Sequence, residues 1–258
     1  MLGTDTEVFL KNKAGDYISS IGLIGGSKDK PLEVECGNLQ EDNVLAEFAI
    51  PPASNKEEFI GYINKTFGIL EAKVKEYDLE IEIKPSAVFP YDQLEHPLAQ
   101  EFGCDPDYNA YTLDVNESPK HENVGALRSC GGHVHVSSEA IAKDENSRAE
   151  FVRILDLVLG VPSVVMDTDK ERRKLYGKAG AYRNKDYGIE YRTLSNFWIQ
   201  TQEHMSWLWD QVKKAEKMFD EGFRINFDIG SRVIECINNG DTDTADALIH
   251  EFNLEVVS

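Results

Sequence analysis

The residues from Tyr176 to Arg192 combine glycines, cations and a carboxylate within a short stretch of an acidic chain. Glu190-Tyr191-Arg192 predicts a short strand, and Glu190 and Arg192 then point to one face because side chains alternate along a strand. Mg²⁺ takes carboxylate oxygens and substrate phosphates as ligands, and a guanidinium matches phosphate geometry. The stretch therefore indicates a site for a metal ion and a nucleotide. An ordinary ion pair on the strand is the alternative.

Five cations lie in the twelve residues before this strand, against the acidic balance of the whole chain. Gly177 and Gly180 allow a positive φ and a close backbone approach, which phosphate-binding loops use. We interpret the segment as a phosphate-binding loop, and a solvated basic loop is the alternative. The cations are Arg172, Arg173, Lys174, Lys178 and Arg183.

Two histidines at alternate positions, His133 and His135, follow the pair Gly131-Gly132 and alternate with valines. The pattern predicts a half-buried strand with both imidazoles on one face. Neutral imidazoles bind metal ions or donate hydrogen bonds to phosphate oxygens. The alternative is a pair of hydrogen-bonded histidines near the end of a sheet.

Carboxylates on two further predicted strands complete the set. Asp5 and Glu7 lie on one side of the amino-terminal strand, and Glu47 is the one charge inside an apolar strand that ends at a proline pair. Carboxylates that face the same way repel each other unless a cation lies between them. We expect these three, Glu190 and the two histidines to form a polyvalent metal site, although Glu47 facing solvent is the simpler alternative.

These segments resemble, in order, those of the phage-type carboxylate-amine ligases, the type 2 amidoligases of the glutamine synthetase and glutamate-cysteine ligase superfamily. The resemblance spans roughly the first four-fifths of the chain and implies an α+β fold like the glutamine synthetase catalytic domain, with a curved, mainly antiparallel sheet backed by helices. The matching segments are Gly3–Phe9, Asp42–Pro52, Gly103–Asp107, Gly131–Val136, Arg172–Arg183 and Gly188–Trp198.

The resemblance also implies ATP and Mg²⁺, with Mn²⁺ as a possible replacement. It leaves open which of Asp5 and Glu7, and which of His133 and His135, contacts the metal directly. The implied metal ligands are Glu7, Glu47, Glu190 and His133. The implied nucleotide contacts are His133, His135, Arg172, Arg173, Lys178, Arg183 and Arg192.

A ligase of this kind would activate a carboxylate as an acyl phosphate, which an amine then converts to an amide. We expect Arg192 and Arg183 to neutralise the transferring phosphoryl group, and Asp5 or Asp105 to accept the amine proton. The substrates would be small-molecule or peptide carboxylates and amines. Glu190→Gln should abolish turnover with Mg-ATP and leave the fold intact. Two alternatives are a metal-dependent hydrolase and a nucleotide-binding or virion-associated protein without catalysis.

Composition limits the partners. The chain has 258 residues, 41% of them hydrophobic, and a formal charge of −19, which disfavours binding to nucleic-acid polymers and anionic membranes. Four cysteines without a paired pattern indicate reduced thiols. We find no signal or membrane-spanning segment and expect a cytoplasmic protein, in the host cytoplasm if a phage encodes it. A homo-oligomer is possible.

Hydrophobic periodicity predicts the helices that support the sheet. An apolar stripe from Phe59 to Tyr77 indicates a helix capped by Ser54 or Asn55, and alternation over residues 79–84 indicates a strand. A second helix covers residues 147–160 and is stopped by Gly160 and Pro162, and a third begins near Gln200.

We assign 1–225 to the catalytic domain and 226–258 to a helical extension packed on it, whose last helix is capped at Asp241 or Thr242. Substrate specificity is expected in the loop of residues 90–120 and in the carboxy-terminal segment, which the resemblance matches poorly.

Overall fold

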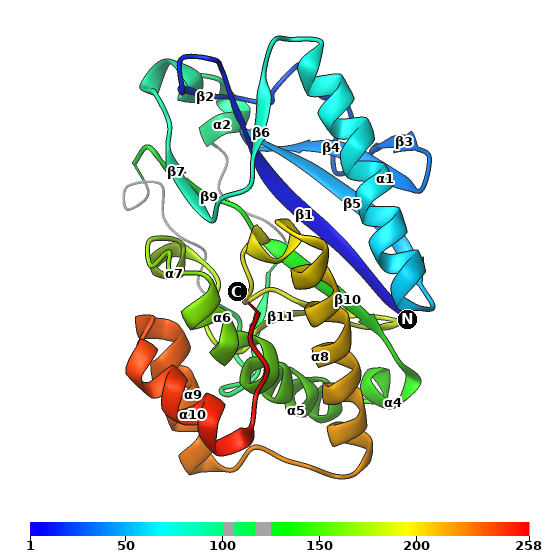
Figure 1. Cartoon of the computed structure of the whole chain (residues 1–258), viewed down its shortest axis with the longest axis vertical. Coiled ribbons are helices and arrows are strands. Elements are labelled where there is room, and N and C mark those ends of the chain that lie inside the picture. Colours follow the sequence, from blue (N-terminus) through cyan, green and yellow to red (C-terminus); the bar gives the residue numbers. More distant parts are fainter. Residues whose placement is uncertain (101–105, 117–124, 258) are drawn as a thin grey trace.

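The computed structural model describes residues 1–100, 106–116 and 125–257, and ten strands in these ranges form one antiparallel sheet (Figure 1). β2 (Tyr17–Ile18) and β6 (Glu80–Glu82) pair with the far end of β1, and β7 (Ser86–Val88) pairs separately with β9 (Leu127–Ser129). The expected α+β fold with a large antiparallel sheet is confirmed. The remaining strands lie in the order β3 (Leu32–Val34), β4 (Gly37–Asp42), β5 (Leu45–Ala53), β1 (Leu2–Lys11), β10 (Gly132–Ser137), β12 (Gly188–Tyr191), β11 (Ala181–Lys185) and β8 (Tyr108–Asn109).

The register of neighbouring strands aligns the polar residues that the sequence analysis singled out. Because residues directly opposite each other in an antiparallel pair point to the same face, these pairs gather their side chains on one side of the sheet. Four strand pairings thus bring together groups from distant parts of the chain. The opposed residues are Asp5 and His133, Glu7 and Glu47, His135 and Glu190, and Arg183 and Glu190.

Helices pack against the sheet and bury its apolar residues (Figure 1). α1 packs on β5, α5 packs on β11 and β12, and α8 lies against both helices; the rings of Phe59 and Trp198 stack 6.0 Å apart. Each fully buried large side chain contributes roughly 1.5–3 kcal/mol, so this layer stabilises the strand register. The helices are α1 (Lys56–Lys75), α2 (Pro97–Gln100), α4 (Glu139–Ala142), α5 (Glu145–Leu155), α6 (Val161–Met166), α7 (Arg172–Leu175), α8 (Gln202–Asp220), α9 (Phe227–Asn239) and α10 (Thr242–Phe252), with 3₁₀ turns at Tyr91–Leu94 and Asn196–Ile199.

Capping side chains begin three of the predicted helices. Asn55 accepts a hydrogen bond from the amide of Glu58, and Thr201 and Asp241 cap α8 and α10 in the same way. The first helix is shorter than predicted: it ends at Lys75, and Tyr77 is 45% exposed. Asp78 adopts a positive φ of 58°, so the chain turns away directly after the apolar stripe. The predicted strand over 79–84 is reduced to the three residues of β6.

The prediction that Gly160 and Pro162 stop the second helix is wrong. α5 continues through a single π turn, Asp156–Gly160, into α6. Pro162 lies in the first turn of α6, where a missing N–H costs little. Gly160 is required by packing, because a Cβ there would lie 2.6 Å from Ile237 Cδ1 and 3.0 Å from the Tyr191 hydroxyl.

Asp156, in this π turn, is fully buried and anchors the strands of the polar face from behind. Its Oδ1 accepts hydrogen bonds from the Tyr191 hydroxyl (2.7 Å) and the Thr193 hydroxyl (3.2 Å), and its Oδ2 accepts one from the Gly180 amide (2.6 Å). Burial raises the pKa of Asp156 to about 7, although these hydrogen bonds oppose the rise. The carboxyl therefore connects the end of β12 to the turn before β11.

The carboxy-terminal residues form the two expected helices. α9 and α10 pack against α6, and α9 also contacts α7. The division into 1–225 and 226–258 stays a prediction. Cys36, Cys130 and Cys236 carry free thiols, whereas Cys104 lies outside the described residues. Within the described ranges, no helix is long and apolar enough to span a bilayer.

We predict that Asp156→Leu lowers the free energy of unfolding by about 3 kcal/mol, because three buried donors lose their acceptor. Asp156→Asn keeps an acceptor and should cost less. Because the pKa of Asp156 is raised in the folded state, the wild-type protein loses stability as pH rises from about 4 to about 7. Asp156→Asn lacks this titration, so the difference in free energy of unfolding between it and wild type should shrink between pH 5 and pH 8. Urea denaturation at both pH values measures this, and equal losses for Leu and Asn would refute the anchoring role.

Candidate functional site

The polar face of the sheet forms the floor of a cavity of about 980 Å³. Strands β4, β5 and β1 contribute one side, β10, β12 and β11 contribute the other, and the segment that begins with α7 borders it. Arg173 does not line it. The other residues expected at the site from the sequence do so: Asp5, Glu7, Glu47, His133, His135, Arg172, Lys178, Arg183, Glu190 and Arg192.

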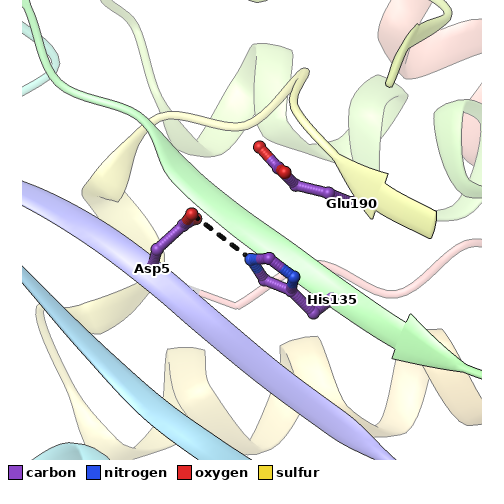
Figure 2. Close-up of side chains that lie close together, drawn as sticks. All are labelled: Asp5, His135 and Glu190. Atoms are coloured by element: carbon purple, nitrogen blue, oxygen red, sulfur yellow. Dashed lines mark ion pairs between the residues drawn. The ribbon is translucent and has the colours of Figure 1, made fainter. Parts of the chain in front are cut away.

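One group of possible metal ligands joins three strands. Asp5 of β1, His135 of β10 and Glu190 of β12 offer donor atoms that all lie within 4.8 Å of one another (Figure 2). His135 Nε2 lies 3.3 Å from Asp5 Oδ2. Two carboxylates and an imidazole fit a divalent ion such as Mn²⁺ or Mg²⁺. The resemblance left open whether Asp5 and His135 contact the metal directly, and the structure brings both into this group.

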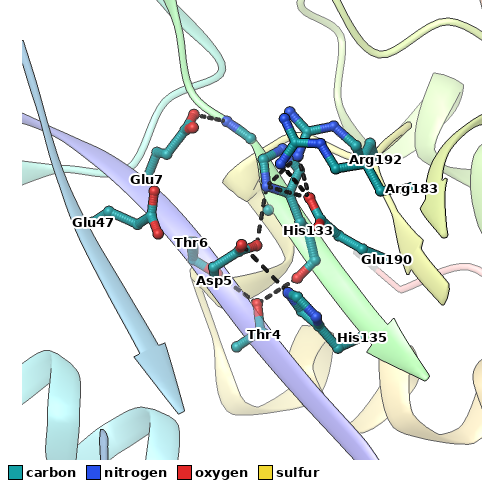
Figure 3. Close-up of polar contacts among 12 residues, drawn as sticks. Thr4, Asp5, Thr6, Glu7, Glu47, His133, His135, Arg183, Glu190 and Arg192 are labelled. Carbon is teal, nitrogen blue, oxygen red and sulfur yellow. Dashed lines mark hydrogen bonds and ion pairs between the residues drawn. The ribbon is translucent and has the colours of Figure 1, made fainter. Parts of the chain in front are cut away.

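His133 lies beside this group with a different set of contacts. Its Nδ1 is 3.0 Å from Asp5 Oδ1 and 3.3 Å from Arg192 Nη1 (Figure 3). A Cβ at Gly131 would collide with the His133 imidazole, so this glycine is required by packing. Burial and the neighbouring Arg192 lower the pKa of His133, which favours a neutral ring that donates to Asp5. Direct metal ligation by His133 stays a prediction.

A second group consists of carboxylates alone. Donor atoms of Glu7, Asp42 and Glu47 also lie within 4.8 Å of one another. Glu7 Oε2 accepts a hydrogen bond from the Gly131 amide (2.5 Å), and the Gln40 amide donates to Glu47 Oε1 (2.8 Å). Oxygen-only donors fit Mg²⁺. The sequence analysis named Asp42 only as the start of a matching segment and did not predict it as a metal ligand. The alternation of Gln40 and Asp42, opposite the strand of Glu47, would have indicated that role.

In this second group, burial and the repulsion between carboxylates both raise pKa values. Burial, with Asp42, raises the pKa of Glu7 to about 8. Burial, with Asp5 and Asp42, raises the pKa of Glu47 well above its ordinary value. A divalent cation would favour the ionised forms and reverse both shifts.

Glu190 has the opposite environment, because three cations surround it. The carboxylate is fully buried; its Oε1 pairs with Arg192 Nη1 and lies 3.2 Å from Arg183 Nη1 (Figure 3). Its Oε2 lies 2.8 Å from Lys185 Nζ. Burial and Asp5 act to raise its pKa, but Arg192, His133 and Arg183 outweigh them and lower it to about 2. Sequence analysis missed Lys185, which the two-residue period starting at Arg183 places on the same face.

Arg172 and Arg173 make contacts that hold the fold together. Arg172 donates to the backbone carbonyls of Cys130 (2.9 Å), Thr193 (2.8 Å) and Arg192 (3.3 Å). Arg173 donates to Ser163 and is buried away from the cavity. The predicted contacts of these two arginines with nucleotide phosphate therefore find no support in their hydrogen bonds.

The glycines of the same segment serve packing too. Gly177 has a φ of 69°, and a Cβ there would collide with the Arg172 guanidinium. The Gly180 amide donates to Asp156, so it does not face a ligand as a phosphate cradle requires. Lys178, by contrast, lines the cavity and makes no ion pair with a carboxylate of the described chain. It is the cation of this segment best placed for an anionic ligand.

Residues 126–216 match the family model described as Phage phiEco32-like COOH.NH2 ligase-type 2. This match supports the family predicted from the sequence. The matched segment of this carboxylate-amine ligase family runs from β9 into α8 and contains both histidines, Lys178 and the cation cluster around Glu190. The carboxylates of β1, β4 and β5 lie outside the match, and Asp105 lies outside the described residues. No curated protein matches the chain.

We predict that the melting temperature of the metal-free protein falls as pH rises from about 5 to about 8. The pKa of Glu7 is about 8 in the folded protein and ordinarily near 4.5, so the folded state binds more protons in this window and loses stability as they leave. Glu7→Gln should flatten this dependence and raise the melting temperature at pH 8. Differential scanning fluorimetry in a chelator measures both, and a flat wild-type profile would contradict the proposed charge repulsion.

Glu190→Gln should lower the melting temperature, the opposite of the effect predicted for Glu7→Gln. The sequence analysis expected this variant to keep its fold, but the buried carboxylate balances Arg183, Lys185 and Arg192. Removing one partner of a buried ion pair costs roughly 3–5 kcal/mol. We predict a lower melting temperature for Glu190→Gln at pH 8, measured beside Glu7→Gln as the matched control. If the melting temperature shifted in the same direction in both variants, the result would contradict the different environments described for Glu7 and Glu190.

Proposed function

We propose that this protein is a carboxylate-amine ligase that uses ATP and Mg²⁺ or Mn²⁺ to join a small-molecule or peptide carboxylate to an amine. The family supports ligase activity, and the single observation that carries the finer proposal is the cavity floor. Two groups of possible metal ligands lie there beside a row of cations, all on one face of the sheet. We further propose that a phage encodes the enzyme and that it acts in the host cytoplasm.

The reaction would proceed in two displacements. A carboxylate oxygen of the substrate attacks the γ-phosphorus of ATP, and the bond to the bridging oxygen breaks so that ADP leaves with the electron pair. The amine nitrogen then attacks the carbonyl carbon of the acyl phosphate, phosphate leaves, and the nitrogen loses one proton, which the released phosphate oxygens accept. No side chain of the protein forms a covalent bond.

The proposed residues bind and orient the reactants. Asp5, His135 and Glu190 would hold one metal ion, and the second carboxylate group would hold another; when bound, these ions neutralise phosphate charge. Arg183 and Arg192, both fixed by Glu190, border the same region and would stabilise charge on the transferring phosphoryl group.

Asp5 is better suited to cation binding than to proton transfer. Burial acts to raise its pKa, but His133 and His135 outweigh burial and lower it well below the ordinary value. A carboxylate with such a low pKa is a weak base at neutral pH. We therefore assign Asp5 to the metal group and propose that the amine proton leaves with phosphate.

Lys178→Ala should weaken binding of Mg-ATP about tenfold, the size of one charge-assisted contact of about 1.4 kcal/mol. Lys217→Ala, which removes an exposed lysine of α8, is the matched control and should bind normally. Isothermal titration calorimetry with ATP, with and without Mg²⁺, measures the affinity. Release of ADP and phosphate is then followed with pooled amines and carboxylates.

Metal-dependent ATP binding with amine-stimulated ADP release would support the ligase. No nucleotide binding by the wild-type protein would overturn it, and bond cleavage that needs metal but no ATP would identify a hydrolase instead. ATP binding without turnover would favour a nucleotide-binding protein.

A further inference from the structure

Tyr187 lies at the cavity wall, in the turn between β11 and β12, and the sequence analysis gave it no role. Its hydroxyl oxygen is 2.5 Å from His135 Nδ1, and the two rings lie 6.1 Å apart. The Tyr187 carbonyl accepts a hydrogen bond from the Ser138 amide (3.0 Å), just after β10 ends. Tyr187 is therefore held against His135 by its side chain and by its backbone.

The second ring nitrogen of His135 faces the proposed metal group. His135 Nε2 lies 3.3 Å from Asp5 Oδ2, and the Glu190 carboxylate points to the same space (Figure 2). His133 approaches Asp5 through its other ring nitrogen, Nδ1, and Arg192 Nη1 lies 3.3 Å from that same atom. The two histidines of the motif thus have separate tasks: His133 orients Asp5, and His135 presents a nitrogen to the cavity.

A hydroxyl suits this position because it donates and accepts. When His135 Nε2–H donates to Asp5, the Tyr187 hydroxyl donates to Nδ1. When Nε2 offers its lone pair to a cation, the proton resides on Nδ1 and is donated to the Tyr187 oxygen. Nδ1 keeps its hydrogen bond to Tyr187 in both tautomers, whereas a phenylalanine would leave Nδ1 without this partner.

We propose that Tyr187 is a positioning residue that fixes the ring orientation of His135 and allows its change of tautomer when a divalent cation binds beside Asp5 and Glu190. The inference rests on the metal site of the proposed function. Partners in this outer position orient metal-binding histidines, and their loss typically costs 10–100-fold in metal affinity.

The test compares Tyr187→Phe with Tyr91→Phe, a control at a tyrosine that is 78% exposed and outside the cavity lining. Mn²⁺ binding without nucleotide is measured by calorimetry. The His135 tautomer is read from ¹⁵N chemical shifts of the imidazole, with and without Mg²⁺. We expect wild-type protein to move the His135 proton from Nε2 to Nδ1 on adding Mg²⁺. Tyr187→Phe should bind Mn²⁺ at least about tenfold more weakly, with an altered tautomer balance, and the control should match wild type.

Wild-type affinity and an unchanged tautomer balance in Tyr187→Phe would overturn this inference and leave the metal site standing. Absence of Mn²⁺ binding by the wild-type protein would overturn the metal site and the inference together. The wild-type Mg²⁺ titration is a second measurement that needs no variant: a His135 proton that stays on Nε2 at saturating Mg²⁺ would also overturn the inference.

Discussion

The buried charge of Glu190 is the constraint on which the polar face depends. A carboxylate out of contact with water is tolerated only when it is paired, and three cations from β11 and the end of β12 surround this one. Pairing in turn requires β12 to lie between β10 and β11 in one register. Behind these strands, Asp156 holds Tyr191 and Thr193, so a second buried carboxyl supports the first. The cations near the cavity are therefore fixed before any ligand arrives.

The other half of the face has an unbalanced charge. On β1, β4 and β5, Glu7, Asp42 and Glu47 approach one another, and burial with the neighbouring carboxylates raises the pKa of Glu7 and of Glu47. Such an arrangement gains stability when a cation binds, whereas the Glu190 cluster is already neutralised. The cavity thus has one end that attracts cations and another that presents fixed positive groups. Asp5 and the two histidines lie where these ends meet (Figure 3).

The elements of the fold were predictable where a local signal was strong. Asn55 and Asp241 cap helices as their side chains indicated, because an N-cap needs only a short-range hydrogen bond. The prediction that Pro162 ends a helix was wrong, because a proline is compatible both with the end of one helix and with the first turn of the next. Tertiary packing determines which of the two forms. The phosphate contacts predicted for Arg172 and Arg173 stay predictions. A cluster of cations beside glycines looks like a phosphate loop, but backbone carbonyls of distant segments accept the hydrogen bonds of Arg172.

The amino-acid pattern was enough to show which side chains share a face of each strand, because that follows from a two-residue period. Asp5, Glu7, Glu190 and the histidines were therefore candidates before the fold was known. It also indicated the ligase family, which the match over residues 126–216 supports. How these residues divide between sites could not be predicted, since the division depends on strand order and on register between segments more than a hundred residues apart. The pairing of β1 with both β5 and β10 separates Glu7 from Asp5 into two groups. Side-chain alternation cannot make that distinction, because both carboxylates point to the same face of one strand.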